Sequence, residues 1–408
     1  MTMTTAPTSH TMLYMVVSCV SRQVERSHGK KVPPAPRREQ MQEARVEPGG
    51  NVAARQGVEM AEEHGAGTKH RQSGAPRVVI VGAGFAGLAC ARQLGDTGID
   101  VMVLDRRNHN LFQPLLYQVA TAALSPADIS EPIRRTLGRY RNIRVLLGEV
   151  VGVDATSKTL TLAEDGTLPY DHLVIATGSE YNYFGHDDWR GWAPGLKSIH
   201  EARLIRQRLL LAFEKAELSS DRGEKEGLLT SVVIGGGPTG VEMAGAIAEL
   251  GHFMIARDFR DLSPEAFRVI LFEAGPRILA AFPDDLAAYA ERILTEAGVQ
   301  VLTATPVESI AKGEVGAGGG TFRTGCIIWG AGVKASPAAS WLGIEGKAGG
   351  RIPVDPDLSV SGFPDIYAIG DTALGLGPDG KPLPALAQVA KQQGEHLGRM
   401  LRRKLVEG

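Results

Sequence analysis

The sequence predicts an α/β fold built from two Rossmann-like dinucleotide-binding domains, one inserted into the other. Two segments, 78–106 and 232–275, each read as a buried strand, a glycine-rich turn, a helix and a second buried strand that ends in an acid. Further short apolar strands follow at 171–179, 325–332 and 365–371. With 408 residues, the chain is long enough for two or three domains with large cores.

The order of these elements predicts the domain boundaries. An outer domain is expected in two parts, 77–195 and 333–408, and the inserted domain at 196–332. The second part ends in a helix that begins after Pro384, whereas 311–325 reads as a glycine-rich hairpin or loop. Residues 1–76 are polar, charged and broken by Pro and Gly, so we expect a disordered tail or a start codon assigned too early.

Composition excludes several classes of partner and site. The net charge of −2 and the pI near 6.6 give no global attraction to nucleic acid, and we expect no such partner. Cys19, Cys90 and Cys326 are widely spaced without a CxxC pattern, which argues against a disulfide scaffold or a zinc site and favours a reducing compartment. The apolar run 12–20 is too short to span a bilayer.

The first glycine-rich turn has the spacing of a dinucleotide cradle. Gly82 permits the tight turn from strand to helix, Gly84 lets a pyrophosphate approach the backbone, and Gly87 lets helix and strand pack closely. The helix N-terminus offers free N–H groups to phosphate. Asp105 ends the second strand, where an acid accepts hydrogen bonds from ribose hydroxyls.

A second cradle repeats this pattern with Gly235, Gly237 and Gly240. Glu273 ends its second strand and is expected to bond the adenosine ribose and repel a 2′-phosphate. This favours NADH over NADPH, although Arg277 lies close by in the sequence.

Two cradles in one chain fit a hydride transfer, because a nicotinamide needs an acceptor ring held face to face with it. A flavin held by the other cradle supplies that geometry. We therefore assign FAD to the first cradle and NADH to the second. Asp371 follows a strand, where a carboxylate and the next helix N-terminus could hold the ribityl or phosphate part of the flavin.

From residue 77 to residue 405, the chain resembles the two-dinucleotide-binding-domain flavoprotein superfamily in the order of its glycine turns, of "ATG" at 176–178 and of "GD" at 370–371. Disulfide reductases and sulfide:quinone reductases of this fold need cysteines, and the matching stretch, "NHNLFQPLLYQVATAALSPADI", has none. That stretch resembles the signature of type II NADH dehydrogenases, and "AQVAKQQ" at 387–393 resembles their quinone-site motif.

The resemblance implies a role for each matching residue. Flavin-binding positions match Gly82, Gly84, Phe85, Ala86, Gly87, Asp105, Thr177, Gly178, Gly370 and Asp371. Positions of the NADH unit match Gly235, Gly237, Thr239, Gly240, Glu273 and Gly332. The catalytic positions match Glu242, an acid near the nicotinamide and flavin, and two glutamines of the quinone site, Gln388 and Gln392.

Elementary chemistry supports these roles and leaves alternatives open. Gln388 and Gln392 are four apart, so they share a helix face, and their neutral amides can donate to quinone carbonyls; a solvated face is the alternative. Glu242 could relay a proton or contact the nicotinamide, but a carboxylate in a first helical turn is also favoured by the dipole. For His109 we expect turn hydrogen bonding, and for Lys391 exposure.

The resemblance implies a non-proton-pumping NADH:quinone oxidoreductase that passes a hydride from NADH to FAD and two electrons to menaquinone or ubiquinone. It implies a cytoplasmic protein, peripheral on the inner face of the cell membrane, and a possible homodimer. Members of the family continue into a C-terminal membrane-binding segment, which we expect to be missing or truncated here. Two other readings remain: a soluble NADH-dependent reductase using a protein, oxygen or soluble acceptor, and a non-catalytic NADH-sensing flavoprotein.

Overall fold

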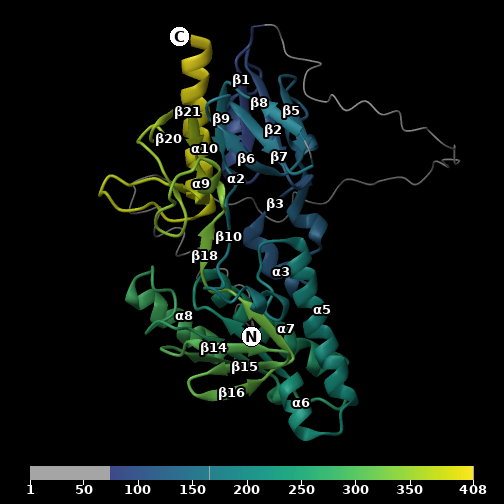
Figure 1. Ribbon diagram of the computed structural model, residues 1–408. Helices are drawn as coiled ribbons and strands as arrows, with labels where there is room; N and C mark the ends of the chain where they lie inside the picture. The colour runs from purple at the N-terminus through teal and green to yellow at the C-terminus, as the bar shows by residue number, and fades with distance from the viewer. Residues whose placement is uncertain (1–73, 165, 408) are drawn as a thin grey trace, which may run out of the picture.

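A computed structural model describes residues 74–164 and 166–407. Our expectations for residues 1–73, including the disordered tail, the apolar run at 12–20 and Cys19, lie outside the described residues. Figure 1 shows two lobes, one above the other, with two strands, β10 and β18, running between them. The described part of the chain begins and ends in the upper lobe, and the middle of the chain forms the lower lobe.

The upper lobe is built on a six-stranded sheet in the order β20-β21-β9-β1-β2-β5. Strand β1 has five apolar or aliphatic-stemmed residues that are all buried, as expected for a central parallel strand. Strands from both ends of the described chain therefore share one sheet. Their bounds are Arg77–Val81 (β1), Asp100–Asp105 (β2), Ile143–Leu147 (β5), His172–Ile175 (β9), Ser359–Val360 (β20) and Phe363–Ala368 (β21).

The lower lobe repeats the plan on a smaller scale with a parallel sheet in the order β13-β12-β11-β17. In both lobes the strand that enters the glycine turn, β1 or β11, lies between the strand that follows its helix and a strand from later in the chain. The bounds are Thr230–Ile234 (β11), Arg268–Phe272 (β12), Val299–Leu302 (β13) and Cys326–Trp329 (β17).

Each lobe also carries a three-stranded antiparallel sheet, β6-β7-β8 above and β14-β15-β16 below. Most of the stretch 311–325, expected as a glycine-rich hairpin or loop, forms the hairpin of β15 and β16. The bounds are Val150–Asp154 (β6), Thr159–Leu162 (β7), Gly166–Pro169 (β8), Val307–Ala311 (β14), Glu314–Ala317 (β15) and Gly320–Arg323 (β16).

Short antiparallel or parallel pairs complete the sheets. Strand β10 pairs with β18 where the chain passes between the lobes in both directions. Strand β3 pairs with β4, and β19 pairs with β22. The bounds are His109–Leu111 (β3), Ser130–Pro132 (β4), Ser179–Tyr181 (β10), Val333–Ala335 (β18), Ile352–Pro353 (β19) and Ala373–Leu374 (β22).

Helices α2 and α7 follow the two glycine turns, and α10 is the helix expected after Pro384. The helix bounds are Phe85–Gln93 (α2), Leu116–Ala120 (α3), Ile133–Leu137 (α4), Ile199–Leu218 (α5), Arg222–Leu228 (α6), Pro238–Asp258 (α7), Asp284–Glu296 (α8), Ala338–Trp341 (α9) and Ala387–Arg402 (α10). Among the helices of residues 74–164 and 166–407, none combines the length and the apolar character that a bilayer crossing requires.

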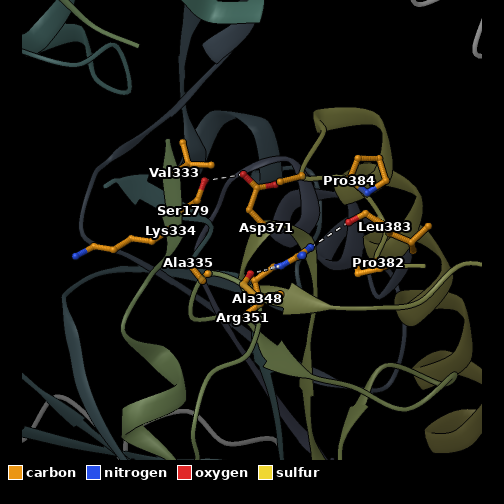
Figure 2. A pocket seen from close by; sticks show the side chains of 12 residues that line it. Ser179, Val333, Lys334, Ala335, Ala348, Arg351, Asp371, Pro382, Leu383 and Pro384 are labelled. Carbon is orange, nitrogen blue, oxygen red and sulfur yellow. Dashed lines mark hydrogen bonds between the residues drawn. The ribbon is translucent and has the colours of Figure 1, made fainter. Parts of the chain in front are cut away.

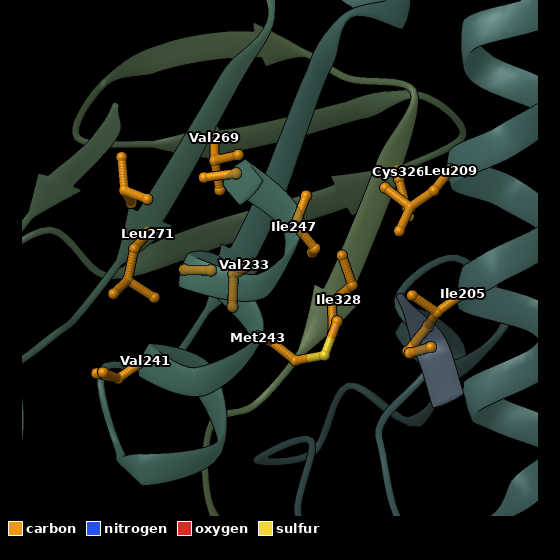
Figure 3. Packing of buried hydrophobic residues seen from close by; sticks show 14 of the residues in the cluster. Ile205, Leu209, Val233, Val241, Met243, Ile247, Val269, Leu271, Cys326 and Ile328 are labelled. Carbon is orange, nitrogen blue, oxygen red and sulfur yellow. The ribbon is translucent and has the colours of Figure 1, made fainter. Parts of the chain in front are cut away.

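Part of the cysteine-free stretch that begins at residue 108 packs into the core of the lower lobe. Figure 3 shows Val233, Met243 and Ile328 meeting between the sheet, α7 and α5. Leu116 and Val119 of α3 belong to the same buried cluster and have no exposed surface. The segment therefore leaves the upper sheet and packs on α5 and α7 of the lower lobe.

Candidate functional site

The first glycine turn has the three geometries that a dinucleotide cradle requires. Gly82 has φ +102°, and a Cβ there would lie 2.3 Å from the Ala176 carbonyl oxygen. A Cβ on Gly87 would lie 1.9 Å from the Gly82 carbonyl oxygen, so strand and helix touch at this point. A Cβ on Gly84 would meet no protein atom within 4 Å. The space over Gly84 is therefore open to a ligand.

Backbone N–H groups at this turn are available to bind an anion. Gly84 is the N-cap of α2 and no side chain caps the helix, which leaves N–H groups of the first turn available. Asp105, at the end of β2, accepts hydrogen bonds from the N–H groups of Ala83 at 2.7 Å and Arg107 at 2.8 Å. The carboxylate is thereby held against the turn, and each of its oxygens keeps a further lone pair for a hydroxyl.

The second turn repeats the first glycine for glycine. Gly235 has φ +104°, and its Cβ would lie 2.6 Å from Ala331. A Cβ on Gly240 would lie 1.8 Å from the Gly235 carbonyl oxygen, and one on Gly237 would meet nothing within 4 Å. Gly237 is the N-cap of α7, again without a side-chain cap. The same physical constraints thus select glycine at the same three places in both turns.

Glu273 occupies the place that Asp105 has in the first turn. Its Oε2 accepts from the N–H of Gly236 and its Oε1 from the N–H of Gly275, each at 2.6 Å. Arg277 lies close to Glu273 in the sequence, but its side chain is bound to other groups. Its guanidinium donates to the carbonyl oxygens of Leu279 and Ala280 and lies 3.2 Å from the Asp284 carboxylate.

Corresponding glycines follow the fourth parallel strand of each unit in chain order, β9 and β17. Gly178 after β9 has φ +71° and Gly332 after β17 has φ +67°, and each leads into a strand that runs toward the other lobe. Gly332 is covered by an exposed aromatic ring, since its Cβ would lie 2.5 Å from Cζ of Phe184. Thr177 shares a 2.6 Å hydrogen bond with Ser336, so hydroxyl groups join the two crossing segments.

Asp371 lies beside these crossing segments. Its Oδ2 accepts a 2.7 Å hydrogen bond from the hydroxyl of Ser179. Figure 2 shows this bond on the wall of a cavity of about 270 Å³ that Arg351 and Leu383 also line. The element that contains Asp371 is a single 3-10 turn, Gly370–Thr372, and α10 begins only at Ala387. The next α-helix in the chain after Asp371 is therefore α10, the helix expected after Pro384.

Helix α10 reaches the first turn because two of its residues lack side chains. A Cβ on Gly394 would lie 2.2 Å from the Ala86 carbonyl oxygen, and one on Gly398 would lie 2.8 Å from that of Cys90. Helices α10 and α2 thus cross at backbone contact. Gly370 lies at the same junction, because its Cβ would meet Ala86 at 3.1 Å and Ala390 at 3.5 Å.

Gln393 is a residue of this junction that we did not single out from the sequence. It is 8% exposed, and its Oε1 accepts a 2.7 Å hydrogen bond from the N–H of Gly370. The signal was present, because Gln393 shares a helix face with the buried residues Ala390, Gly394 and Leu397. A glutamine on an otherwise small or apolar face needs a buried partner.

The two glutamines predicted for a quinone site both lie on α10, and both are exposed. Lys391, between them, is exposed as expected and lies 3.9 Å from Glu395. Neither Gln388 nor Gln392 hydrogen-bonds to another described residue, so their amides are available to a ligand. Both the ligand-binding role and the solvated face fit this placement.

Glu242 lies in the second turn of α7, two residues beyond Gly240, so the first-turn position expected from the sequence, on which the helix-dipole alternative depended, is wrong. Its side chain is half-buried, and no residue of the described chain donates a hydrogen bond to its carboxylate. Burial raises the pKa of this carboxyl from the ordinary value of 4.5 to about 7. Near neutral pH the group therefore exists in both protonation states, as a proton-transfer group requires.

The remaining predicted residues lie around the turns. Thr239 is half-buried in the first turn of α7, and Phe85 begins α2 with its ring 5.6 Å from that of Phe112. His109 forms the expected local hydrogen bond, 3.0 Å long, with its neighbour Asn108, but it is the first residue of strand β3 and not part of a turn. Within residues 74–164 and 166–407, no group of three His, Cys, Asp or Glu residues is placed to hold a metal.

The described cysteines are unsuited to dithiol chemistry. Cys90 and Cys326 are both buried and unpaired, one in each lobe. Burial raises the pKa of each thiol to about 12, which disfavours the reactive thiolate.

Comparison with known proteins agrees with this geometry. Residues 76–394 match the family described as pyridine nucleotide-disulphide oxidoreductase. The chain is 41% identical over 332 residues to the type II NADH:quinone oxidoreductase NdhA of Mycobacterium tuberculosis, covering 78% of this chain and 70% of that protein. It is 38% identical to Ndh of the same organism, covering 81% of this chain and 73% of the relative.

Solved structures share the fold. NDH2 from Plasmodium falciparum, in a structure titled as a complex with NADH, superposes with a TM-score of 0.72 at 22% identity, covering 80% of this chain and 83% of that one. The fold class predicted from the sequence is confirmed. The predicted FAD and NADH cofactors are confirmed by the family to which the relatives belong. The chain belongs to the type II NADH:quinone oxidoreductases, FAD-dependent enzymes within the pyridine nucleotide-disulphide oxidoreductase family.

Proposed function

We propose that this chain carries out the reaction of its family through the residues described above: a hydride from NADH to FAD, then two electrons to a quinone. The observation that carries the proposal is the repetition of one cradle geometry in both lobes, with open space over Gly84 and Gly237. The proposed division is an FAD domain at 77–195 and 333–408, with the NADH domain at 196–332 between its parts.

The first turn fits FAD. The uncapped N-terminus of α2 would bind the pyrophosphate, Asp105 the adenosine ribose, and Asp371 the ribityl chain. Phe85, Ala86, Thr177, Gly178 and Gly370 would line the path between these groups. The flavin, when bound, supplies the electron chemistry by accepting a hydride and returning two electrons.

The second turn fits NADH in preference to NADPH. Both oxygens of Glu273 are held by backbone N–H groups, so its negative charge is fixed where a 2′-phosphate would have to lie. The guanidinium of Arg277 is engaged by carbonyl oxygens and Asp284, which leaves it poorly placed to neutralise such a phosphate. Thr239 and Gly332 would complete the nicotinamide side of this unit.

Glu242 is proposed as an acid near the nicotinamide and the flavin that holds a proton or relays it to the reduced acceptor. Its half-buried side chain lies in the second turn of α7, the helix that follows the second glycine turn. With a pKa near 7, it can donate a proton to the reduced acceptor and recover it from solvent.

Gln388 and Gln392 are proposed to bind the quinone carbonyl oxygens. Their amides are exposed on α10, and the same helix touches the first turn at Ala86 through Gly394. A quinone bound there would be held beside the flavin site by the helix that helps to form it. Menaquinone and ubiquinone present the same carbonyl pair, so this site accommodates either.

The place of action is proposed to be the cytoplasmic surface of the cell membrane. A quinone is lipid-soluble, and the end of α10 carries exposed Arg399 and Arg402, followed directly by exposed Arg403, whose charges attract anionic lipid at about 1 kcal/mol each. A homodimer, as suggested by the family resemblance, is part of this proposal.

Anaerobic titration of the purified protein with NADH tests the proposal. We expect a yellow protein whose flavin absorbance is bleached by one equivalent of NADH and restored by a soluble menaquinone or ubiquinone analogue. A reductase for soluble acceptors would instead reoxidise only with oxygen, ferricyanide or a protein. A flavoprotein that NADH does not bleach would be a sensor, and a colourless protein that takes up no FAD would refute the proposal.

Gln388→Ala tests the quinone site separately. We expect NADH to bleach the flavin at the wild-type rate, while quinone turnover falls at least tenfold because a carbonyl partner is lost. Lys391→Ala, at an exposed position on the same helix, is the matched control. Unchanged quinone kinetics in Gln388→Ala would place the acceptor elsewhere.

A further inference from the structure

The backbone of Lys197 is held in place by the start of helix α5. It precedes α5, whose N-cap Ser198 and Glu201 form reciprocal hydrogen bonds. Glu201 Oε2 also accepts from the N–H of Lys197 at 3.0 Å, so the backbone of this lysine is fixed. The chain arrives there through Gly195, where a Cβ would lie 2.1 Å from the ring of Tyr181.

The ammonium group of Lys197 lies where three segments meet. It donates a 2.9 Å hydrogen bond to Ser179 Oγ, and Ser179 donates at 2.7 Å to Asp371 Oδ2. The same ammonium lies 5.6 Å from the ring centroid of Tyr181, which is buried. Residues 179, 197 and 371 thus form one hydrogen-bonded chain from a cation to a carboxylate.

The polarity of this chain is fixed by chemistry. An ammonium group can only donate, so Ser179 accepts from Lys197 and its own hydrogen must go to Asp371. One oxygen of Asp371 is thereby occupied, and the other is left for a ligand hydroxyl. Burial lowers the pKa of Lys197 while the charge of Asp371 opposes this, as expected for a cation removed from water beside an anion.

We propose that Lys197 is a positioning residue of the flavin site, which orients Asp371 through Ser179 and places a positive charge that favours the reduced flavin. This inference rests on the proposed binding of FAD at Asp371. Two-electron reduction adds negative charge to a flavin, so a fixed cation nearby stabilises the reduced form more than the oxidised form. A unit charge acting over about 10 Å at an effective dielectric constant of about 20 changes such an equilibrium roughly tenfold.

The test compares midpoint potentials of the FAD-loaded enzyme, measured anaerobically against a reference dye. Lys197→Met should lower the equilibrium constant for two-electron reduction about tenfold, which is about 30 mV. Lys197→Gln keeps a hydrogen-bond donor for Ser179 but loses the charge, so it should lower the potential by a similar amount. This variant replaces Lys197→Met in the test if the methionine variant does not fold. Lys197→Arg should restore most of the wild-type potential.

Lys334 provides the matched control, because it lies on the neighbouring strand β18, paired with Glu180 at 3.5 Å, and is 41% exposed. Lys334→Met should leave the potential near the wild-type value. A wild-type potential in Lys197→Met, or an equal shift in Lys334→Met, would overturn the inference while leaving the proposed function intact. A wild-type protein that binds no FAD would refute the proposed function itself.

Discussion

Replacing Glu242 with glutamine should stabilise the protein at alkaline pH, with no effect at acid pH. The carboxyl has a folded-state pKa of about 7, raised by burial above 4.5. Below pH 4.5 the group is protonated in both states, so it adds nothing to pH dependence. Between pH 4.5 and 7 the unfolded chain releases the proton first, and the wild type loses stability as the pH rises. Above pH 7 the loss is complete.

The size of this loss follows from the two pKa values. A rise from 4.5 to about 7 corresponds to roughly 3 kcal/mol, and this is an upper limit because the side chain is only half-buried. Glutamine has nearly the same shape and carries no charge at any pH. The variant should therefore equal the wild type near pH 4 and exceed it by up to about 3 kcal/mol at pH 8–9.

Urea unfolding followed by tryptophan fluorescence, at a series of pH values and without NADH, measures the difference directly. Glu345→Gln, at an exposed position, is the control and should follow the wild type throughout. A difference between Glu242→Gln and the wild type that is the same at pH 4 and pH 9 would refute burial as its cause. Absence of any difference at pH 9 would refute the raised pKa.

Two further substitutions test the cradle and the helix junction. Gly237→Val fills the open space over the start of α7, so FAD should be retained while the NADH affinity falls at least tenfold in an anaerobic titration; an unchanged affinity would exclude this turn as the NADH site. Gln393→Ala leaves the N–H of Gly370 without its acceptor and should cost about 1–3 kcal/mol in urea unfolding, whereas exposed Lys391→Ala should cost almost nothing. Equal stability of these two variants would contradict the assigned role of Gln393.

The glycine turns were predictable because their constraints are local. Gly82 and Gly235 both need a positive φ at a turn between a strand and a helix, and the apolar strands on either side are recognisable as short runs. Asp105 and Glu273 follow from the same pattern, since each ends the second strand of its unit.

The docking of α10 could not be predicted in the same way. In the sequence, Gly394 and Gly398 only disfavour a helix. The packed structure shows that, because they have no side chain, the backbone of α2 can contact α10 at both positions. Gln393 was within a motif that we quoted, yet its partner, Gly370, is 23 residues away. The single 3-10 turn that contains Asp371 and the short strand β22 after it were not predicted either.

By itself, the sequence predicted two dinucleotide cradles, the acids Asp105 and Glu273 that end their second strands, and the family that the chain resembles. Tertiary structure alone decided that Lys197, Ser179 and Asp371 form one hydrogen-bonded chain, that α3 packs against α7, and that α10 closes on the first turn. The physical reason is the distance along the chain between the residues that make each contact. A turn or a strand is specified by neighbouring residues, whereas these contacts join segments far apart in the chain, and only the packing of both lobes brings them together.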